Sequence, residues 1–367
     1  IVLGLDPLPR VPRLVVLNLC ANCAREAIAA MLRSGAVVAI DGALQPLIHL
    51  VMRHQLDGNW EDFCTSVVAY YAALMDSVRG NAQLIDCEEL QPASLRFLTF
   101  FARYWAFPPF QDKYPFDSWL PFLLRVVERL TGDDDPSVDQ TLRAPFLFDS
   151  GIVETLPSCI AIALQLRADT LVPAIAAVLV RLCEIYKPRL PDIGQAVLPA
   201  VLPLLTDSVP HEETLMDLVA RSVVNESLYE TFLAGGGMEK LERFVAALRR
   251  RGKKADVQVI RFMDAFALAQ SPAALLRAIA FGHRTIADSI YFENQILSIA
   301  RQVVDMEEWT LDGDGDDADD GNSDVEEALL CLNEMRRSSS TLTKEEKAIL
   351  GQAARRIRGK SCACVIL

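Results

Sequence analysis

The sequence lacks an uncharged apolar run long enough to cross a membrane as a helix. Such a helix needs about 20 apolar residues, whereas the longest candidate, Ile193 to Thr206, covers 14 residues and contains prolines. The sequence also lacks alternating apolar and polar residues set between Asn-Gly or Asp-Gly turns, the pattern that predicts β-hairpins. We therefore expect neither a membrane-spanning helix nor a sheet.

Patterns typical of catalytic and metal sites are scarce as well. None of the four histidines has a nucleophile or carboxylate at a known catalytic spacing. These histidines are His49, His54, His211 and His283. The segment AGGGME resembles a phosphate loop but lacks its lysine and the preceding strand. Cys20 and Cys23 form one C-x-x-C without a second pair at zinc spacing. We expect no enzymatic activity, no cofactor and no metal site, and the nine scattered cysteines indicate reduced, intracellular thiols.

The chain carries little net charge outside one acidic tract. Twelve of the 49 acidic residues lie between Asp305 and Glu327, and the remaining 37 nearly balance the 36 Lys and Arg residues. The basic segment RRRGKK, from Arg249 to Lys254, is short and has no aromatic residues between its charges, so we interpret it as a solvated turn between helices. No nucleic-acid partner is expected.

Apolar residues recur every three or four positions through most of the chain, which predicts helices. Five prolines stand beside such segments, and we expect them in the first turns of helices, where the missing N–H costs little. These are Pro46, Pro121, Pro157, Pro173 and Pro199. Segments around Pro46, Pro121, Pro157, Pro199 and Lys240 align with steps of 75, 36, 42 and 41 residues. A unit of about 40 residues indicates a helical solenoid.

Two segments carry a resemblance to a known family. VVLNLCANCAREAIAAMLRSGAVVAI and SVVNESLYETFLAGGGMEKLERFVAAL look like armadillo repeats, with HEAT repeats as a near neighbour. The resemblance covers roughly residues 10–305 and implies a right-handed, all-α solenoid with a protein-binding groove. It also implies a sharp bend at Gly35 and at Gly235 to Gly237. Because the chain starts with Ile1, we expect residues 1–305 to be an array that continues upstream.

The pattern changes after Val304. Residues 306–326 have the composition of a disordered acidic linker, and residues 327–360 are expected to form a helical, basic segment. Its last helix should begin with a capping box made by Thr343 and Glu346. Part of the acidic tract also matches an EF-hand loop with Asp316, Asp320, Asn322, Asp324 and Glu327 at ligand positions, but Ala318 breaks the pattern. We favour a solvated spacer over a calcium site.

Aromatic residues gather between Phe97 and Phe122, and prolines within this segment prevent a continuous helix. The cluster either plugs the solenoid or offers anchors to a partner. The candidate anchors are Phe107, Phe110, Tyr114, Phe116 and Trp119.

The last four residues, Cys364 to Leu367, match the C-a-a-X prenylation pattern, and a terminal Leu favours geranylgeranyl. Cys362 is a candidate for palmitoylation. Four cations precede the cysteines and would attract anionic lipid. They are Arg355, Arg356, Arg358 and Lys360. We expect residues 361–367 to be a lipidation tail that holds the protein on the cytoplasmic face of a membrane.

These observations favour a membrane-anchored armadillo-like scaffold that recruits a protein partner into its groove. One alternative is a regulator of small GTPases, either an exchange factor or a chaperone. Another alternative is an armadillo adaptor without a lipid anchor.

Overall fold

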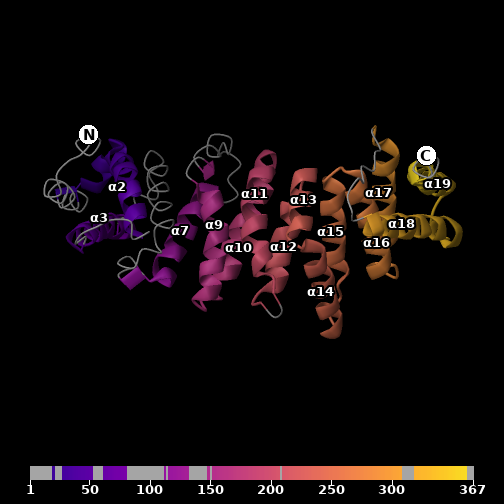
Figure 1. The fold of residues 1–367 in the computed structure, drawn as a ribbon, viewed down its shortest axis with the longest axis horizontal. Coiled ribbons are helices and arrows are strands. Elements are labelled where there is room, and N and C mark those ends of the chain that lie inside the picture. The colour runs from indigo at the N-terminus through magenta and orange to yellow at the C-terminus, as the bar shows by residue number, and fades with distance from the viewer. Residues whose placement is uncertain are drawn as a thin grey trace. The chain divides into compact units, whose positions relative to one another are not determined.

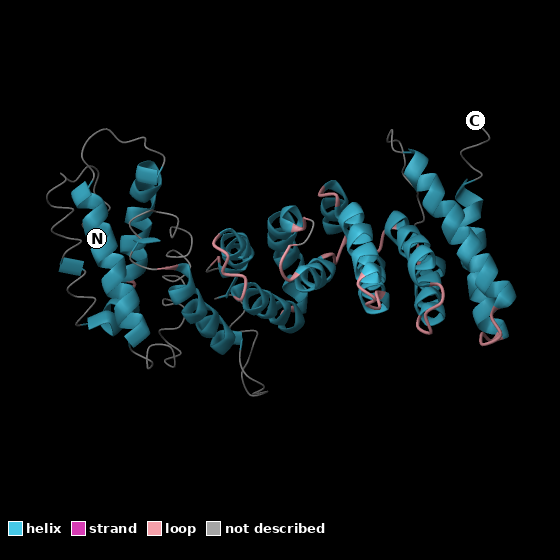
Figure 2. Ribbon diagram, turned by 90° about the horizontal axis from the view of Figure 1, so that it is seen from below, coloured by secondary structure: helices cyan, strands magenta, loops and turns pink. Residues whose placement is uncertain are grey.

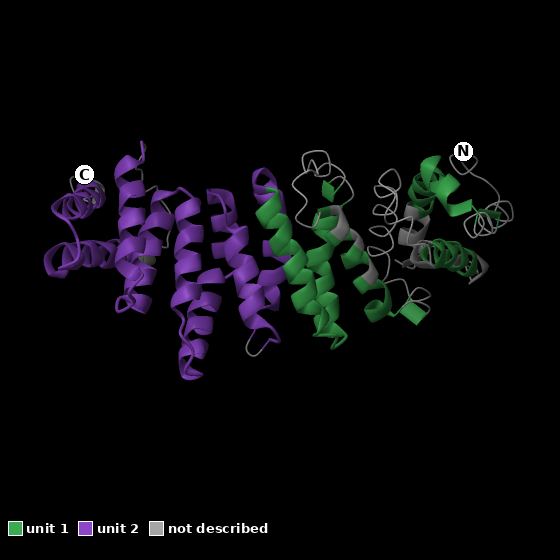
Figure 3. Cartoon of the chain, turned by 180° about the vertical axis from the view of Figure 1, so that it is seen from behind, with its two compact units in different colours: residues 1–186 green, residues 187–367 purple. Residues whose placement is uncertain are grey.

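The computed structural model describes residues 19–20, 27–52, 61–80, 111–112, 115–131, 147–148, 151–206, 209–307 and 318–361. Regular structure in these ranges is helical and includes no strand (Figures 1 and 2). The prediction of an all-α fold is confirmed, while the armadillo-like repeat arrangement stays a prediction. The chain divides into two compact units, residues 1–186 and residues 187–367 (Figure 3).

The first unit contains a short helix, Ala27–Arg33, followed by longer ones. These are α2 (Ala36–Met52), α3 (Glu61–Gly80), α7 (Phe116–Thr131), α9 (Ile152–Gln165) and α10 (Leu171–Ile185). Helix α10 packs against both α7 and α9. Buried residues recur at helical spacing, such as Leu156 and Ile160 in α9 and Ile175 and Leu179 in α10. Burial of these apolar faces is the main favourable contribution to the packing.

The first of the predicted bends lies in this unit. Helix Ala27–Arg33 meets Ala36–Leu44, the start of α2, at 77°, and Gly35 between them has φ +70°. This left-handed conformation suits glycine because it has no Cβ. Among the described residues, no single helix has the length and apolar composition to cross a membrane, although this bent pair passes both criteria when taken together.

The second unit is a succession of helices that pack mainly on near neighbours in the chain. Its helices are η2 (Lys187–Arg189), α11 (Leu190–Val201), η3 (Leu202–Leu204), α12 (Glu212–Ser222), α13 (Glu226–Ala234), α14 (Gly237–Arg250), α15 (Asp256–Leu268), α16 (Pro272–Ile286), α17 (Phe292–Asp305), α18 (Ala318–Ser338) and α19 (Lys344–Ser361). The main contacts join α11 with α12, α12 with α15, α15 with α16, α16 with α17 and α18, and α19 with α17 and α18.

The second predicted bend separates α13 from α14. Gly236 has φ +68°, and a Cβ built on Gly237 would lie 2.3 Å from the ring of Phe232. That ring belongs to a buried aromatic group with Phe262 and Phe266 of α15, with centroids 5.9 and 5.7 Å away. Glycine is therefore favoured at Gly236 by the backbone conformation, and at Gly237 by the buried Phe232 ring, which leaves no room for a Cβ.

Side-chain caps explain several helix starts. The Asn225 side chain accepts a hydrogen bond from Leu228 N at 2.9 Å at the start of α13. In α19 the predicted capping box is confirmed: Glu346 N donates to Thr343 Oγ1 at 3.2 Å, and Thr343 N donates to Glu346 Oε2 at 2.9 Å. These bonds satisfy backbone donors that a helix leaves unpaired at its first turn.

The prediction that five prolines mark helix starts is wrong for four of them. Only Pro173 lies in a first turn, whereas α2, α7, α9 and α11 continue through their prolines. In α9, residues on both sides of Pro157 are buried, including Leu156 and Ile160. Burial of the two flanking turns against neighbouring helices offsets the one backbone hydrogen bond that proline removes.

The prediction of a disordered acidic linker over residues 306–326 is also wrong for residues 318–326. Helix α17 ends at Asp305, and residues 318–326 already belong to α18. Asp324 is buried, and α18 packs on α16 and α19. The acidic residues do not prevent folding here, because Arg277 and Arg284 of α16 neutralise the charge of Asp324. Residues 308–317 lie outside the described residues.

Candidate functional site

The most extensive polar contact within the described part of the second unit joins α16 and α18. Asp324 lies between two arginines of α16: Arg277 Nε donates to Asp324 Oδ2 at 2.7 Å, and Arg284 Nη2 donates to Asp324 Oδ1 at 3.1 Å. The Asp324 side chain is only 9% exposed. A carboxylate this buried needs charged partners to offset lost hydration. Two arginines provide them, so the contact fixes the first half of α18 on α16.

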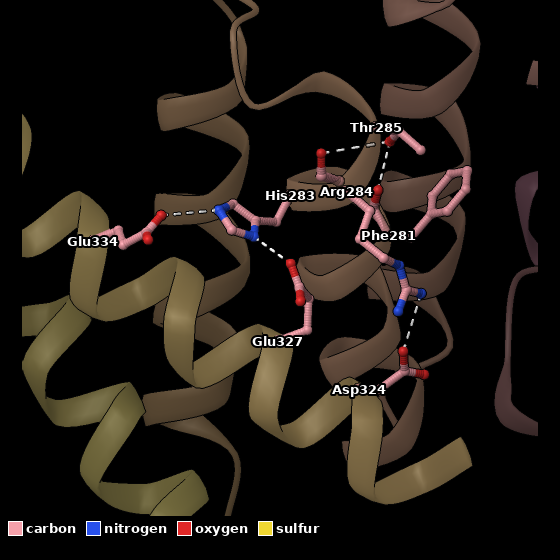
Figure 4. A network of polar contacts seen from close by, with 8 residues as sticks. Phe281, His283, Arg284, Thr285, Asp324, Glu327 and Glu334 are labelled. Carbon is pink, nitrogen blue, oxygen red and sulfur yellow. Dashed lines mark hydrogen bonds and ion pairs between the residues drawn. The ribbon is translucent and has the colours of Figure 1, made fainter.

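His283 extends this contact along the same two helices (Figure 4). Its Nδ1 lies 2.5 Å from Glu327 Oε1, and its Nε2 lies 3.3 Å from Glu334 Oε2. The imidazole ring also stacks on Phe292 of α17, with centroids 6.2 Å apart and planes 26° apart. The His283 side chain is 16% exposed. A single imidazole therefore contacts two turns of α18 and the first residue of α17.

Helical spacing explains how the two helices present matching charges. Asp324 and Glu327 are three residues apart, and Glu334 follows seven residues after Glu327, so all three lie on one face of α18. Arg277 and Arg284 are likewise seven residues apart on α16. Sequence reasoning missed this site. Two sequence patterns could have indicated it. Arg277 and Arg284 are seven residues apart in one predicted helix. In another, three acids occupy relative positions i, i+3 and i+10, so each set lies on one helix face.

Two further titratable groups border this contact. Burial raises the pKa of Tyr229, in α13, to about 12, while the neighbouring Arg277 opposes that shift and Asp324 adds to it. Burial also raises the pKa of the Cys331 thiol in α18, and the charges of Glu327 and Glu334 raise it further. Cys331 is therefore an unreactive thiol as long as α18 remains packed.

The geometry disagrees with the calcium alternative for the acidic tract. Asp324 and Glu327 lie in a helix and contact basic side chains of α16, whereas an EF-hand loop turns its carboxylates onto one ion. Within the described ranges, no group of three or more His, Cys, Asp and Glu residues could hold a metal ion. The solvated-spacer interpretation is equally wrong for Asp324, which is buried.

The predicted membrane-binding cations have different environments. Arg356 donates to the carbonyl oxygens of Val304 and Met306, and to that of Glu307 at 3.4 Å. These carbonyls lie at the C-terminal end of α17, where a cation is favourable. Arg356 is therefore an internal cap that joins α19 to α17. Arg355 and Arg358 are exposed. Cys362 and Cys364 lie outside the described residues, as does the Lys360 side chain.

The predicted aromatic anchors are only partly described. Phe107, Phe110 and Tyr114 lie outside the described residues. Phe116 and Trp119 lie in α7, are 2% and 0% exposed, and form an edge-to-face pair with centroids 5.5 Å apart. These two rings are part of the core around α7. Their assignment as partner anchors is wrong because the same helical spacing that groups them turns them inward.

The basic segment from Arg249 to Lys254, at the end of α14, contacts other helices through two of its side chains. Arg249 donates to the Thr285 carbonyl oxygen, and Lys253 pairs with Glu213 of α12. These contacts are exposed, so each contributes little to stability. The prediction of a turn between helices is confirmed for residues 251–254, whereas Arg249 and Arg250 form the last turn of α14.

A second unusual carboxyl group lies in the first unit. Asp41 in α2 is 1% exposed. Burial raises its pKa to about 7, and the Tyr71 hydroxyl opposes the shift without cancelling it. A carboxyl group that titrates near neutral pH makes the stability of this unit depend on pH.

Comparisons with protein-family models, with curated proteins and with solved structures give no match for this chain.

Proposed function

We propose that the protein is a helical-repeat scaffold that binds other proteins and has no catalytic role. The observation that supports this proposal is the packing of the second unit, in which each helix contacts mainly helices that lie one to three elements away in the sequence. Helical repeats share this organisation, and they commonly present an extended protein-binding surface. The armadillo-like spacing of the sequence agrees with this proposal.

The outer face of α19 supports the same proposal. Its buried residues recur at helical spacing and are Leu350, Ala353, Ala354 and Ile357. Its exposed residues are mostly polar or charged and include Lys344, Glu345, Gln352, Arg355 and Arg358. A helix with one apolar and one polar face can pack on a helical array while its polar face remains in water.

We propose the turn between α16 and α17 as one point of partner contact. Ile290 and Tyr291 are adjacent there and are 82% and 58% exposed. Large exposed apolar side chains next to each other are candidate anchors for a protein partner. Leu166, between α9 and α10, is 51% exposed and has polar sequence neighbours, Gln165 and Arg167, so it provides a control with a single exposed apolar side chain.

The experiment that tests the scaffold proposal begins with proximity labelling in cells and continues with purified candidates. We expect at least one labelled protein to bind the purified chain directly. The double variant Ile290→Asp/Tyr291→Ala should weaken that binding at least tenfold, because two anchors are lost, whereas Leu166→Asp should not. If no purified candidate binds, the scaffold proposal is wrong. If binding is unaffected by the double variant, only the proposed contact point is wrong.

We further propose attachment to a membrane through a lipid on Cys364, supported by the C-a-a-X pattern and by the exposed Arg355 and Arg358. One lipid chain binds reversibly, and each cation adds about 1 kcal/mol towards anionic lipid. Intact mass of the protein from eukaryotic cells tests this proposal. A geranylgeranyl adduct with loss of the last three residues supports it, and an unmodified Cys364 refutes it.

Regulation of a small GTPase remains an alternative for the bound partner. Nucleotide release from a panel of purified GTPases distinguishes it from a passive scaffold. Acceleration by the protein would favour the regulator, and no acceleration would favour the scaffold.

A further inference from the structure

The two ring nitrogens of His283 present a specific hydrogen-bonding problem. Nδ1 lies 2.5 Å from a Glu327 oxygen and Nε2 lies 3.3 Å from a Glu334 oxygen. An ionised carboxylate only accepts hydrogen bonds, and a neutral imidazole carries a single N–H. Only the protonated ring can donate to both glutamates at once. With a neutral ring, one nitrogen lone pair would face a carboxylate oxygen.

We infer that His283 is a proton-operated latch: its protonated ring holds α18 on α16, and loss of the proton loosens that contact. The inference concerns regulation and does not depend on the identity of a bound partner. The direction follows from the donor count. Below the pH at which this ring deprotonates, both bonds to α18 are present. Above it, one bond is lost and replaced by a repulsive contact, so the attachment of α18 weakens as pH rises.

The charged groups around His283 support this direction. From α18, the groups facing the ring are the carboxylates of Glu327 and Glu334, one at each ring nitrogen, and each needs a donated N–H. From α17, the contacting group is the uncharged ring of Phe292. On α16 itself, Arg284 and Arg277 are paired with Asp324. Arginine keeps its charge at every relevant pH, so the Asp324 contact does not change when His283 loses its proton.

The latch acts on the whole C-terminal helix pair because α18 also packs on α19. The buried face of α18 includes Ala328, Cys331 and Leu332, each 0% exposed. Cys331 can react with a thiol reagent only when α18 separates from its neighbours. Its labelling rate therefore measures how often the latched contact opens.

The test is mass-resolved thiol labelling of Cys331 in the full chain at pH 6, 7 and 8. Each rate is divided by the rate for the same residue in denatured protein, which removes the intrinsic effect of pH on thiol reactivity. We expect opening to increase about tenfold from pH 6 to pH 8, as loss of one hydrogen bond to a charged group predicts. No change over this range would overturn the inference.

Variants separate the latch from general loss of stability. His283→Gln should open more readily at pH 6 and lose the pH dependence. Glu334→Gln is the milder change, since Glu334 is 57% exposed. Its amide can donate to an unprotonated Nε2, so the pH dependence should shrink while α18 stays packed. If either variant keeps the full pH dependence of the wild type, the inference is wrong.

Two controls complete the design. Asp324→Asn should raise opening at every pH and keep the pH dependence, because the arginine contact is independent of the His283 proton. His211→Asn changes a histidine outside this contact, and asparagine tolerates the φ of +59° found there. It should behave as the wild type. Loss of the pH dependence in either control would assign that dependence to another group and contradict the latch.

Discussion

Arg277 in α16 donates its Nε–H to the carboxylate of Asp324 in α18 at 2.7 Å, across 47 positions of sequence. Arg284 binds the other oxygen of the same carboxylate. A residue inside the most acidic tract of the chain is thereby buried and neutralised. Because of this contact, the second part of that tract is a helix packed on α16 and not a solvated segment.

Replacement of Asp324 should therefore weaken α18 much more than replacement of a neighbouring acid. Asp324→Ala leaves two arginines facing an apolar gap and should lower the free energy of unfolding by about 2 kcal/mol. Glu326→Gln, at an exposed position of α18, should change it by less than about 0.5 kcal/mol. Chemical denaturation of both variants measures the difference, and equal effects would show that the Asp324 contact is energetically unimportant.

Asp41 should make the first unit less stable as pH rises. The raised pKa of about 7 means that the folded state holds a proton that the unfolded chain has already released. Stability is then highest below about pH 4, falls between pH 4 and pH 7, and is constant above that range. Asp41→Asn removes the penalty, so the variant should gain up to about 4 kcal/mol at pH 8 and almost nothing at pH 4.

Hydrogen exchange of amides in α2 and α3 at pH 5 and pH 8 measures this effect in the relevant unit. After correction for intrinsic rates, the wild type should lose protection at pH 8 relative to Asp41→Asn. Identical protection in the two proteins at pH 8 would mean that the Asp41 carboxyl group is already compensated by a partner.

The helix class and the cap of α19 could be predicted from the sequence because each depends on residues within a few positions, whereas the bends are implied by the resemblance to armadillo repeats. The pair Thr343 and Glu346 is an example of such a local pattern, and Gly236 lies at one of the bends. The Asp324 contact could not be predicted in the same way, because a partner 40 to 47 residues away decides whether this carboxylate is buried. The prediction that Pro157 marks a helix start is wrong for the same reason. Burial of the neighbouring turns of α9 outweighs the local preference of proline for the first turn of a helix.

Two glycine-to-alanine substitutions, one at the bend between α13 and α14 and one in α19, should change the free energy of unfolding in opposite directions. Gly237→Ala places a Cβ against the Phe232 ring and should lower the free energy of unfolding by about 2 kcal/mol. Gly359→Ala, in α19, meets nothing within 4 Å and should raise it by up to about 1 kcal/mol. Thermal denaturation compares the two variants. Equal tolerance of both changes would contradict the close packing of Gly237 on Phe232.

The cations of α19 should separate into a structural and a surface group. Arg356→Gln should destabilise the packing of α19 on α17 by about 1 to 2 kcal/mol, because it removes the hydrogen bonds to the α17 carbonyls. Arg358→Gln should leave stability unchanged and weaken binding to anionic vesicles about fivefold. Denaturation and vesicle sedimentation, both with the unlipidated chain, test this pair. The opposite pattern would reverse the two assignments.

Hydrogen exchange of α18 in the full chain tests most directly the claim that the acidic tract folds onto α16. We expect amides between Asp324 and Met335 to be protected at least a hundredfold over an unstructured peptide, and to a similar degree as those of α16. Exchange of these amides at the rate of an unfolded acidic segment, with α16 still protected, would contradict the claim.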